Sequence, residues 1–183
     1  MYTCTNGALA QLPRQDGAFT LTASNPTSPV NGWPISACGQ HLWVGGPTCS
    51  YCPDVVKPNC PKGDITALYA GSGMDVEVPG GQQYYLDAYW NVGYTQAHSA
   101  YVPPGATIGG FAAYQNGGFV NINTGALGWV ACPSTASGGG GNDGRWNLVA
   151  KNSSNAANLN GCTAINLKVN PVPAGTYGAW QYT

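Results

Sequence analysis

Apolar and polar residues alternate over short stretches along most of this chain. In residues 19–24, FTLTAS, every second residue is apolar and the residues between them are Thr or Ser. Residues 163–169, TAINLKV, alternate in the same way. A period of two places the apolar side chains on one face of a half-buried β-strand. The pattern therefore predicts strands that each turn one face toward a core.

Twelve such β-rich runs follow one another, separated by clusters of Gly, Pro, Asn or Ser, and no stretch carries a convincing helical period. The runs cover residues 18–24, 40–45, 65–70, 74–79, 82–90, 93–100, 107–115, 118–124, 128–133, 145–151, 163–169 and 178–182. This organisation predicts an all-β fold, an antiparallel β-barrel or β-sandwich of about 10–12 short strands. Because no internal repeat or domain boundary is visible, we expect one β domain over residues 1–183.

Three segments between these runs have the composition of turns or loops. Residues 115–119, QNGGF, suit a hairpin turn, because Asn-Gly tolerates positive φ at both central positions. Residues 102–107, VPPGAT, combine Pro, which fixes φ, with a Gly for the corner. Residues 134–144, STASGGGGNDG, are expected to form a surface loop. They are not a phosphate loop, because no Gly-Lys-Ser/Thr follows them.

The low charge of the chain excludes one class of partner. Only 7% of the residues are charged and the net charge is −1, against an average charged fraction of about 25%. Nucleic-acid binding needs clustered Lys and Arg, and six scattered basic residues cannot form such a patch. No apolar run approaches the ~20 residues that a membrane span needs. We therefore expect neither nucleic-acid binding nor membrane insertion.

Seven cysteines in 183 residues indicate an oxidising compartment. Asn152, in the tripeptide Asn-Ser-Ser, is a candidate N-glycosylation acceptor and points the same way. No apolar signal segment follows Met1, so we interpret Met1 as a start placed on a mature chain. These features predict a secreted protein.

Two disulfides are expected from the spacing of the cysteines. Cys132 and Cys162 are remote from the other cysteines and flank the glycine-rich loop, and closing about 31 residues should stabilise the fold by roughly 3–4 kcal/mol. Cys52 and Cys60 would close a short proline-bearing loop for roughly 2–3 kcal/mol. The pairing of the other three stays open, with one cysteine left over or bridged to another chain. These three are Cys4, Cys38 and Cys49.

Zinc is the alternative for part of this cysteine set. Cys49 and Cys52 form a Cys-x-x-Cys pair, with Cys60 beyond and Cys38 or His41 available as a fourth ligand. Structural zinc sites usually need a second clean pair, and disulfides compete well in an oxidising compartment. We therefore expect no metal centre and no cofactor.

The residues that could catalyse a reaction form no convincing site. His98 and Ser99 are neighbours on a predicted strand, so their side chains should point to opposite faces. No Gly-x-Ser-x-Gly elbow is present. Asp75 and Glu77 should share a strand face, as a glycosidase pair could, but a solvated face is the commoner cause. We expect no catalytic residue and interpret His98 as a hydrogen-bonded structural residue.

The tryptophans offer a binding alternative to catalysis. Six are present, and exposed on strands they could form a platform that stacks on sugars, although large aromatic residues on strands more often fill a core. They are Trp33, Trp43, Trp90, Trp129, Trp146 and Trp180.

Several longer segments resemble one family of small secreted proteins of filamentous ascomycetes, whose members are described as IgE-binding proteins and as elicitors of the plant hypersensitive response. The similarity runs from about Phe19 to the C-terminus, and the stretches TQAHSA and GAWQY are distinctive. The matching segments cover residues 19–46, 78–87, 94–111, 128–133 and 178–183.

The resemblance implies secretion, a cell-wall or apoplastic location, and recognition by plants as a trigger of defence. It implies no catalytic residues, and it supports the pairs Cys52–Cys60 and Cys132–Cys162. The leading hypothesis is thus a non-enzymatic secreted fungal elicitor whose partner is a plant cell-surface or apoplastic protein. A cell-wall carbohydrate-binding β-module, with a glycan as partner, is the alternative, and a hydrolase with an unrecognised site is the third.

Overall fold

The computed structural model describes residues 12–115, 117–122, 128–134 and 144–183, and within them it is all-β with antiparallel strand pairs. The predicted fold class is confirmed. The strands are β1 (Phe19–Ser24), β2 (Ile35–Cys38), β3 (His41–Val44), β4 (Ser50–Tyr51), β5 (Tyr84–Leu86), β6 (Val92–Tyr94), β7 (Thr107–Ile108), β8 (Phe111–Ala113), β9 (Phe119–Asn121), β10 (Gly128–Pro133), β11 (Trp146–Lys151), β12 (Thr163–Pro171) and β13 (Gln181–Tyr182).

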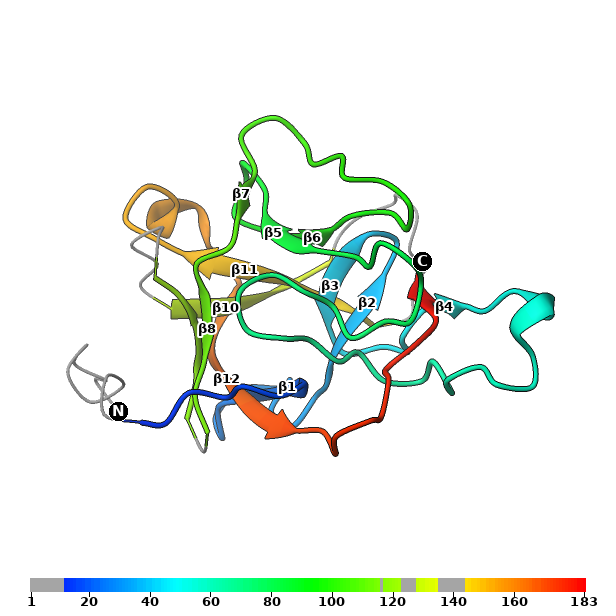
Figure 1. Cartoon of the computed structure of the whole chain (residues 1–183). Helices are drawn as coiled ribbons and strands as arrows, with labels where there is room; N and C mark the ends of the chain where they lie inside the picture. The colour runs from blue at the N-terminus through cyan, green and yellow to red at the C-terminus, as the bar shows by residue number, and fades with distance from the viewer. Residues whose placement is uncertain (1–11, 116, 123–127, 135–143) are drawn as a thin grey trace.

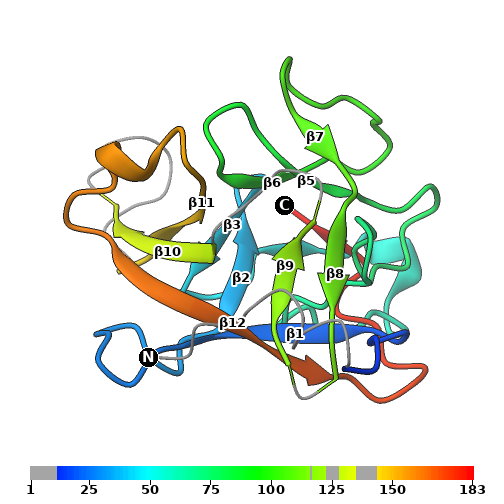
Figure 2. The ribbon, with the colours of Figure 1, turned by 90° about the vertical axis from the view of Figure 1, so that its left-hand side faces the viewer.

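One long, curved sheet organises these strands (Figure 1). Its order is β1-β12-β10-β11-β3-β6-β5-β7, and β2 pairs with β3 beside this path. The edge strand β1 curls back toward β2 through a single bridge between Thr22 and Pro34. The sheet does not close into a barrel, and the arrangement is sandwich-like. Figure 2 shows β12 running beside β1, with the separate β8–β9 hairpin next to them.

The period-two pattern of the sequence is visible in the burial of the strands. Along β1 the residues alternate between buried and half-buried, and in β12 Ile165, Leu167 and Val169 are buried while their neighbours are exposed or half-buried. The buried faces meet in one core with Phe19 and Leu148 among its members. Burial of these apolar faces is the main stabilising term for a fold of this kind.

A cluster of aromatic rings occupies part of this core, with Phe119 at its centre. The Phe119 ring centroid lies 5.8 Å from that of Phe19, 5.5 Å from that of Phe111 and 5.8 Å from that of Trp129. A fourth ring, that of Tyr84, lies 6.2 Å away. The backbone carbonyl of Phe119 also accepts a hydrogen bond from Trp129 Nε1 at 2.7 Å, which satisfies the one polar atom of that indole.

Two of the predicted strands are not regular strands in the structure. Residues 65–70 and 74–79 make only isolated bridges, such as those of Leu68 with Phe19 and with Met74. The Gly and Pro residues that surround them interrupt longer pairing. Conversely, none of the β-rich runs identified in the sequence covered β2. This strand joins β3 through Gly39 and Gln40, which both have positive φ, as a two-residue hairpin turn requires.

The expected turns are present where the structure describes them. Gly105 has a φ of 80° and the Ala106 N–H donates to the Pro103 carbonyl, so the predicted corner at 102–107 is confirmed. The hairpin between β8 and β9 turns at residues 114–118, of which residue 116 lies outside the described residues. None of the described helical turns has the length or hydrophobicity of a membrane-spanning helix.

Three disulfides link the described cysteines. Cys52 pairs with Cys60 and Cys132 pairs with Cys162, which are the two pairs expected from the sequence. The structure adds a third, Cys38–Cys49, which joins the end of β2 to the residue before β4. Cys4 lies outside the described residues.

Candidate functional site

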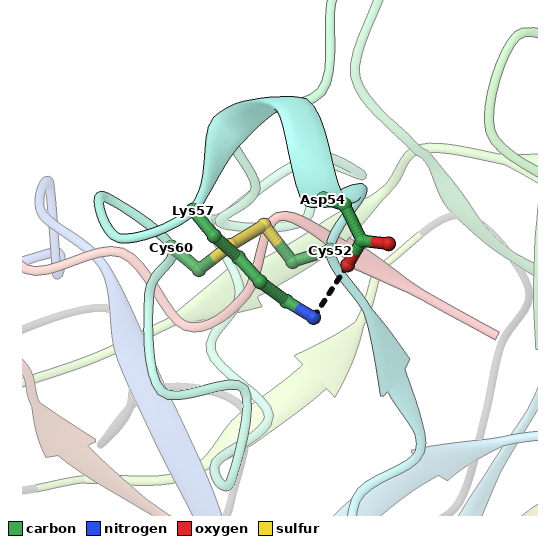
Figure 3. A network of polar contacts seen from close by, with 4 residues as sticks. All are labelled: Cys52, Asp54, Lys57 and Cys60. Atoms are coloured by element: carbon green, nitrogen blue, oxygen red, sulfur yellow. Dashed lines mark hydrogen bonds and ion pairs between the residues drawn. A yellow bond between two sulfur atoms is a disulfide. The ribbon is translucent and has the colours of Figure 1, made fainter.

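The stapled loop, residues 52–60, projects from the body of the molecule beyond the short β4–β13 pair (Figure 1). The Cys52–Cys60 disulfide closes it, and the ammonium group of Lys57 lies 2.7 Å from Asp54 Oδ1 (Figure 3). One turn of 3₁₀ helix, η1 (Asp54–Val56), shapes its tip. Val55 on this turn is 93% exposed. The loop therefore presents an apolar side chain to solvent on a covalently closed frame.

An open cleft with a volume of about 610 Å³ begins at the base of the stapled loop. One wall is the segment 59–65 and the other includes residues 175–177. The functional groups that line it are an amide, an ammonium, two carboxylates, a hydroxyl and a phenol. They belong to Asn59, Lys62, Asp64, Glu77, Thr176 and Tyr177.

Buried hydrogen bonds fix the two walls of the cleft relative to each other. The hydroxyl of Tyr182, which is fully buried, accepts from the Ala67 N–H at 2.9 Å and donates to the Ile65 carbonyl at 3.1 Å. The Glu77 N–H donates to the carbonyl of Ala179 at 3.2 Å. The C-terminal segment thus positions residues from both walls.

Asp75 lies in the protein interior rather than beside Glu77 on a solvated face. Its side chain is 1% exposed, and its Oδ1 accepts a hydrogen bond from the Tyr69 hydroxyl at 3.0 Å, while Oδ2 has no partner. Burial raises the pKa of the Asp75 carboxyl, against the opposing effects of the Tyr69 hydroxyl and the Gly178 N–H. Glu77 lines the cleft and Asp75 does not, so the two carboxylates predicted to share a face do not form a pair open to substrate.

We expect Asp75→Asn to stabilise the protein at pH 7 by about 1 kcal/mol, because it removes a buried charge with an unpaired oxygen. The folded protein holds the Asp75 proton more tightly than the unfolded chain does. The stability contributed by the protonated acid is therefore present below the ordinary pKa of 3.8 and is lost as pH rises through the raised pKa.

Urea unfolding at pH 3 and pH 7 measures this effect. The gain from Asp75→Asn should be largest at pH 7 and should shrink in acid, whereas Asp16→Asn, at an exposed carboxylate, should leave the curve unchanged. Equal destabilisation by Asp75→Asn at both pH values would contradict the interpretation.

His98 lies in a turn, which corrects the expected strand over residues 93–100. The strand β6 ends at Tyr94, and the Ser99 N–H donates to the Gln96 carbonyl at 3.1 Å. His98 has a φ of 61° and an exposed side chain. Among the described residues, nothing forms a hydrogen bond with its imidazole, and the Ser99 hydroxyl accepts from the Tyr101 N–H instead. The structure thus does not support the prediction of a hydrogen-bonded structural residue, and His98 is not one half of a His–Ser dyad.

The tryptophans do not form the sugar-stacking platform considered from the sequence. All six are described, none has an exposed side chain, and Trp129 is buried in the core. Trp43 donates through Nε1 to the Cys38 carbonyl at 2.8 Å. The exposed aromatic residues are tyrosines instead, on turns and short strands. They are Tyr51, Tyr69, Tyr89, Tyr101 and Tyr177.

Asn152, the candidate glycosylation acceptor, is buried, with 4% of its surface exposed. Its Oδ1 accepts from the Ser154 N–H at 2.8 Å, the Ser154 hydroxyl at 2.7 Å and the Asn155 N–H at 2.9 Å. A side chain that organises a turn in this way does not present its amide nitrogen to solvent. The structure therefore argues against Asn152 as a glycan site in the folded protein.

The cysteines weighed as zinc ligands are bonded to each other. Cys38 and Cys49 form one disulfide, and Cys52 and Cys60 form another. Within the part of the chain that the structure describes, no group of three His, Cys, Asp or Glu side chains could hold a metal ion. The proposed surface loop at 134–144 lies largely outside the described residues.

Asp64 and Tyr177 were not predicted as site residues, and they line the cleft from segments that lie far apart in the chain. No neighbouring residue in the sequence distinguished Asp64 from the other carboxylates as part of a binding site. Tyr177 could have been recognised, because an aromatic residue in the turn-like sequence AGTYG is expected at the surface rather than on the buried face of a strand.

Comparisons with known proteins agree with the secreted class of the chain. A family model described as "PhiA-like secreted protein" matches residues 19–183. An "Uncharacterized secreted protein" of the fungus Arthroderma benhamiae (strain ATCC MYA-4681 / CBS 112371) is 36% identical over 172 residues, which cover 89% of this chain and 85% of the relative. No solved structure matches the chain significantly.

Proposed function

The chain belongs to the PhiA-like secreted protein family of fungi, and we propose that this secreted protein is a non-enzymatic elicitor that plants recognise through its folded surface. Its partner is a plant cell-surface or apoplastic protein, and the response is hypersensitive cell death and defence. The elicitor role is carried by the resemblance of segments such as TQAHSA and GAWQY to elicitor proteins.

One structural observation supports recognition at the stapled loop in particular. Val55 is 93% exposed, although exposure of an apolar side chain to water is unfavourable in free energy. Tyr51, beside the loop, is 54% exposed. The disulfide and the turn of η1 hold both ends of the loop, so little conformational entropy is lost when a partner binds. Exposed loops on a rigid scaffold are the usual carriers of recognition.

The arrangement of titratable groups supports action without catalysis. The Ser99 hydroxyl beside His98 accepts from the Tyr101 N–H, and Asp75, the carboxyl that contacts the Tyr69 hydroxyl, is buried. Asp64 and Glu77 in the cleft keep the hydrolase alternative open to test, because two carboxylates across a cleft are what glycoside hydrolysis requires.

Leaf infiltration with purified protein tests the proposal. We expect necrosis from the wild type and from the folded variants His98→Ala and Glu77→Gln, and at least a severalfold weaker response to Val55→Asp. Tyr89→Ala, at a side chain that is 82% exposed on a different loop, is the matched control and should act like the wild type.

Two results would overturn the proposal. A wild-type protein that causes no necrosis on any host tested removes the elicitor role. A folded Glu77→Gln or His98→Ala variant that is silent, while Val55→Asp remains active, moves the hydrolase alternative to first place. Near-UV circular dichroism establishes that each variant is folded.

A further inference from the structure

A second depression lies directly across the segment Asp64–Ile65 from the cleft. It is a pocket of about 140 Å³, and Asp64 and Ile65 line both it and the cleft. Besides the Asp64 carboxylate, its polar lining consists of hydroxyl groups, which come from β1, β2 and the segments around residues 48 and 66. They belong to Thr20, Thr22, Ser36, Thr48 and Thr66. The cleft and the pocket lie on either side of these two shared residues and are together called the groove.

The hydroxyl groups of the pocket are held in place by the backbone. The Ser36 hydroxyl donates to the Gly45 carbonyl at 2.5 Å, and Thr66 Oγ1 accepts from the Ala37 N–H at 2.8 Å. The Thr48 hydroxyl lies 2.8 Å from that of Thr66. On the cleft side, the Ser50 hydroxyl donates to the Gly63 carbonyl at 2.8 Å. A groove with its lining fixed in this way loses little entropy when it binds a ligand.

The chemistry of the groove fits a neutral ligand that carries many hydroxyl groups. Lys62 offsets one of the two carboxylates, Asp64 and Glu77, so the small remaining negative charge disfavours an anionic ligand. No ion pair among the described residues uses any of the three, so their donors and acceptors are available. Tyr177 is 45% exposed at the cleft, and an exposed phenol ring offers an apolar face with a polar tip. A sugar ring presents the complement, an apolar face edged by hydroxyl groups.

The polar groups of the groove are spread along its length. Tyr177 lies in the cleft, and the half-buried residues Thr20, Thr22 and Thr48 line the pocket beyond Asp64. This separation suits an extended ligand rather than a compact one.

We propose that the groove binds a neutral cell-wall polysaccharide, with one sugar ring stacked on Tyr177 and the chain crossing Asp64 toward the hydroxyl-lined pocket. This activity is separate from the elicitor role and does not depend on the stapled loop. It would hold the secreted protein on a glycan surface while the loop stays free.

Binding of the full-length protein to cellohexaose, laminarihexaose and N-acetylchitohexaose, measured by calorimetry, tests the proposal. We expect at least one of these neutral oligomers to bind, and Tyr177→Ala to weaken that binding about tenfold. Asp64→Asn should weaken it severalfold. The matched controls Tyr89→Ala and Asp16→Asn, at exposed positions outside the groove, should bind like the wild type. Oligogalacturonate, whose carboxylates would meet Asp64 and Glu77, should bind more weakly than the neutral oligomers.

The proposal fails if none of the neutral oligomers binds, or if the folded Tyr177→Ala and Asp64→Asn variants bind as well as the wild type. Leaf infiltration separates this failure from failure of the elicitor role. Tyr177→Ala should still cause necrosis, and Val55→Asp should still bind the oligomer.

Discussion

Replacing Phe119 with alanine is expected to lower the free energy of unfolding by about 3–5 kcal/mol. The Phe119 side chain is 2% exposed, and four aromatic rings surround it at centroid distances of 5.5–6.2 Å. Its removal leaves a cavity that the four remaining rings, held by strands of the long sheet and by β8, cannot collapse to fill. Loss of the aromatic contacts adds to the lost transfer free energy.

Equilibrium unfolding in guanidinium chloride with the disulfides intact measures this loss. Phe119→Leu is the matched control, because it keeps most of the volume and should cost less than half as much. The midpoint should fall while the denaturant dependence stays the same, as expected when only stability changes. A cost below about 1 kcal/mol for Phe119→Ala would mean that the cluster repacks.

The strands with strict alternation were predictable because their pattern records the burial directly. In β1 and β12 every second side chain faces the core, so the sequence alone marks both the strand and its buried face. The two strand predictions that were wrong also have a specific cause. Residues 65–70 and 74–79 have strand-like composition, but their backbone groups pair with different neighbours one residue at a time, which a local pattern cannot record.

The candidate site was much less predictable than the fold. The stapled loop followed from the spacing of Cys52 and Cys60, because a short loop between two cysteines is a local feature. The groove did not, because it forms where residues around 64, 77 and 177 meet, and only the tertiary fold brings them together. The tryptophans were considered as a binding surface because they are large and aromatic, but a large apolar surface favours burial. The exposed aromatic residues that the structure describes are tyrosines, whose hydroxyl group is polar.

Gly178 shows how closely the C-terminal segment fits the walls of the cleft. A Cβ at this position would overlap the buried hydroxyl of Tyr182, and it would lie 3.1 Å from the Ala67 Cβ and 3.2 Å from the Ala67 nitrogen. The backbone of Gly178 does not have positive φ, so the requirement for glycine is steric. The Tyr182 hydroxyl cannot move aside without losing its hydrogen bonds to Ala67 and Ile65.

Gly178→Ala is therefore expected to destabilise the protein by about 2–4 kcal/mol, through overpacking and the loss of a buried hydrogen bond. Gly118→Ala, where the nearest atom to a new Cβ is the Leu167 carbonyl oxygen at 4.0 Å, is the matched control and should be nearly neutral. Tyr182→Phe removes the hydroxyl that the new methyl group would strike. The loss in the double variant Gly178→Ala/Tyr182→Phe should then fall short of the sum of the two single losses, although the close contacts with Ala67 remain. Urea unfolding of all four variants gives the coupling, and additive losses would show that Gly178 is required for a reason other than its contact with Tyr182.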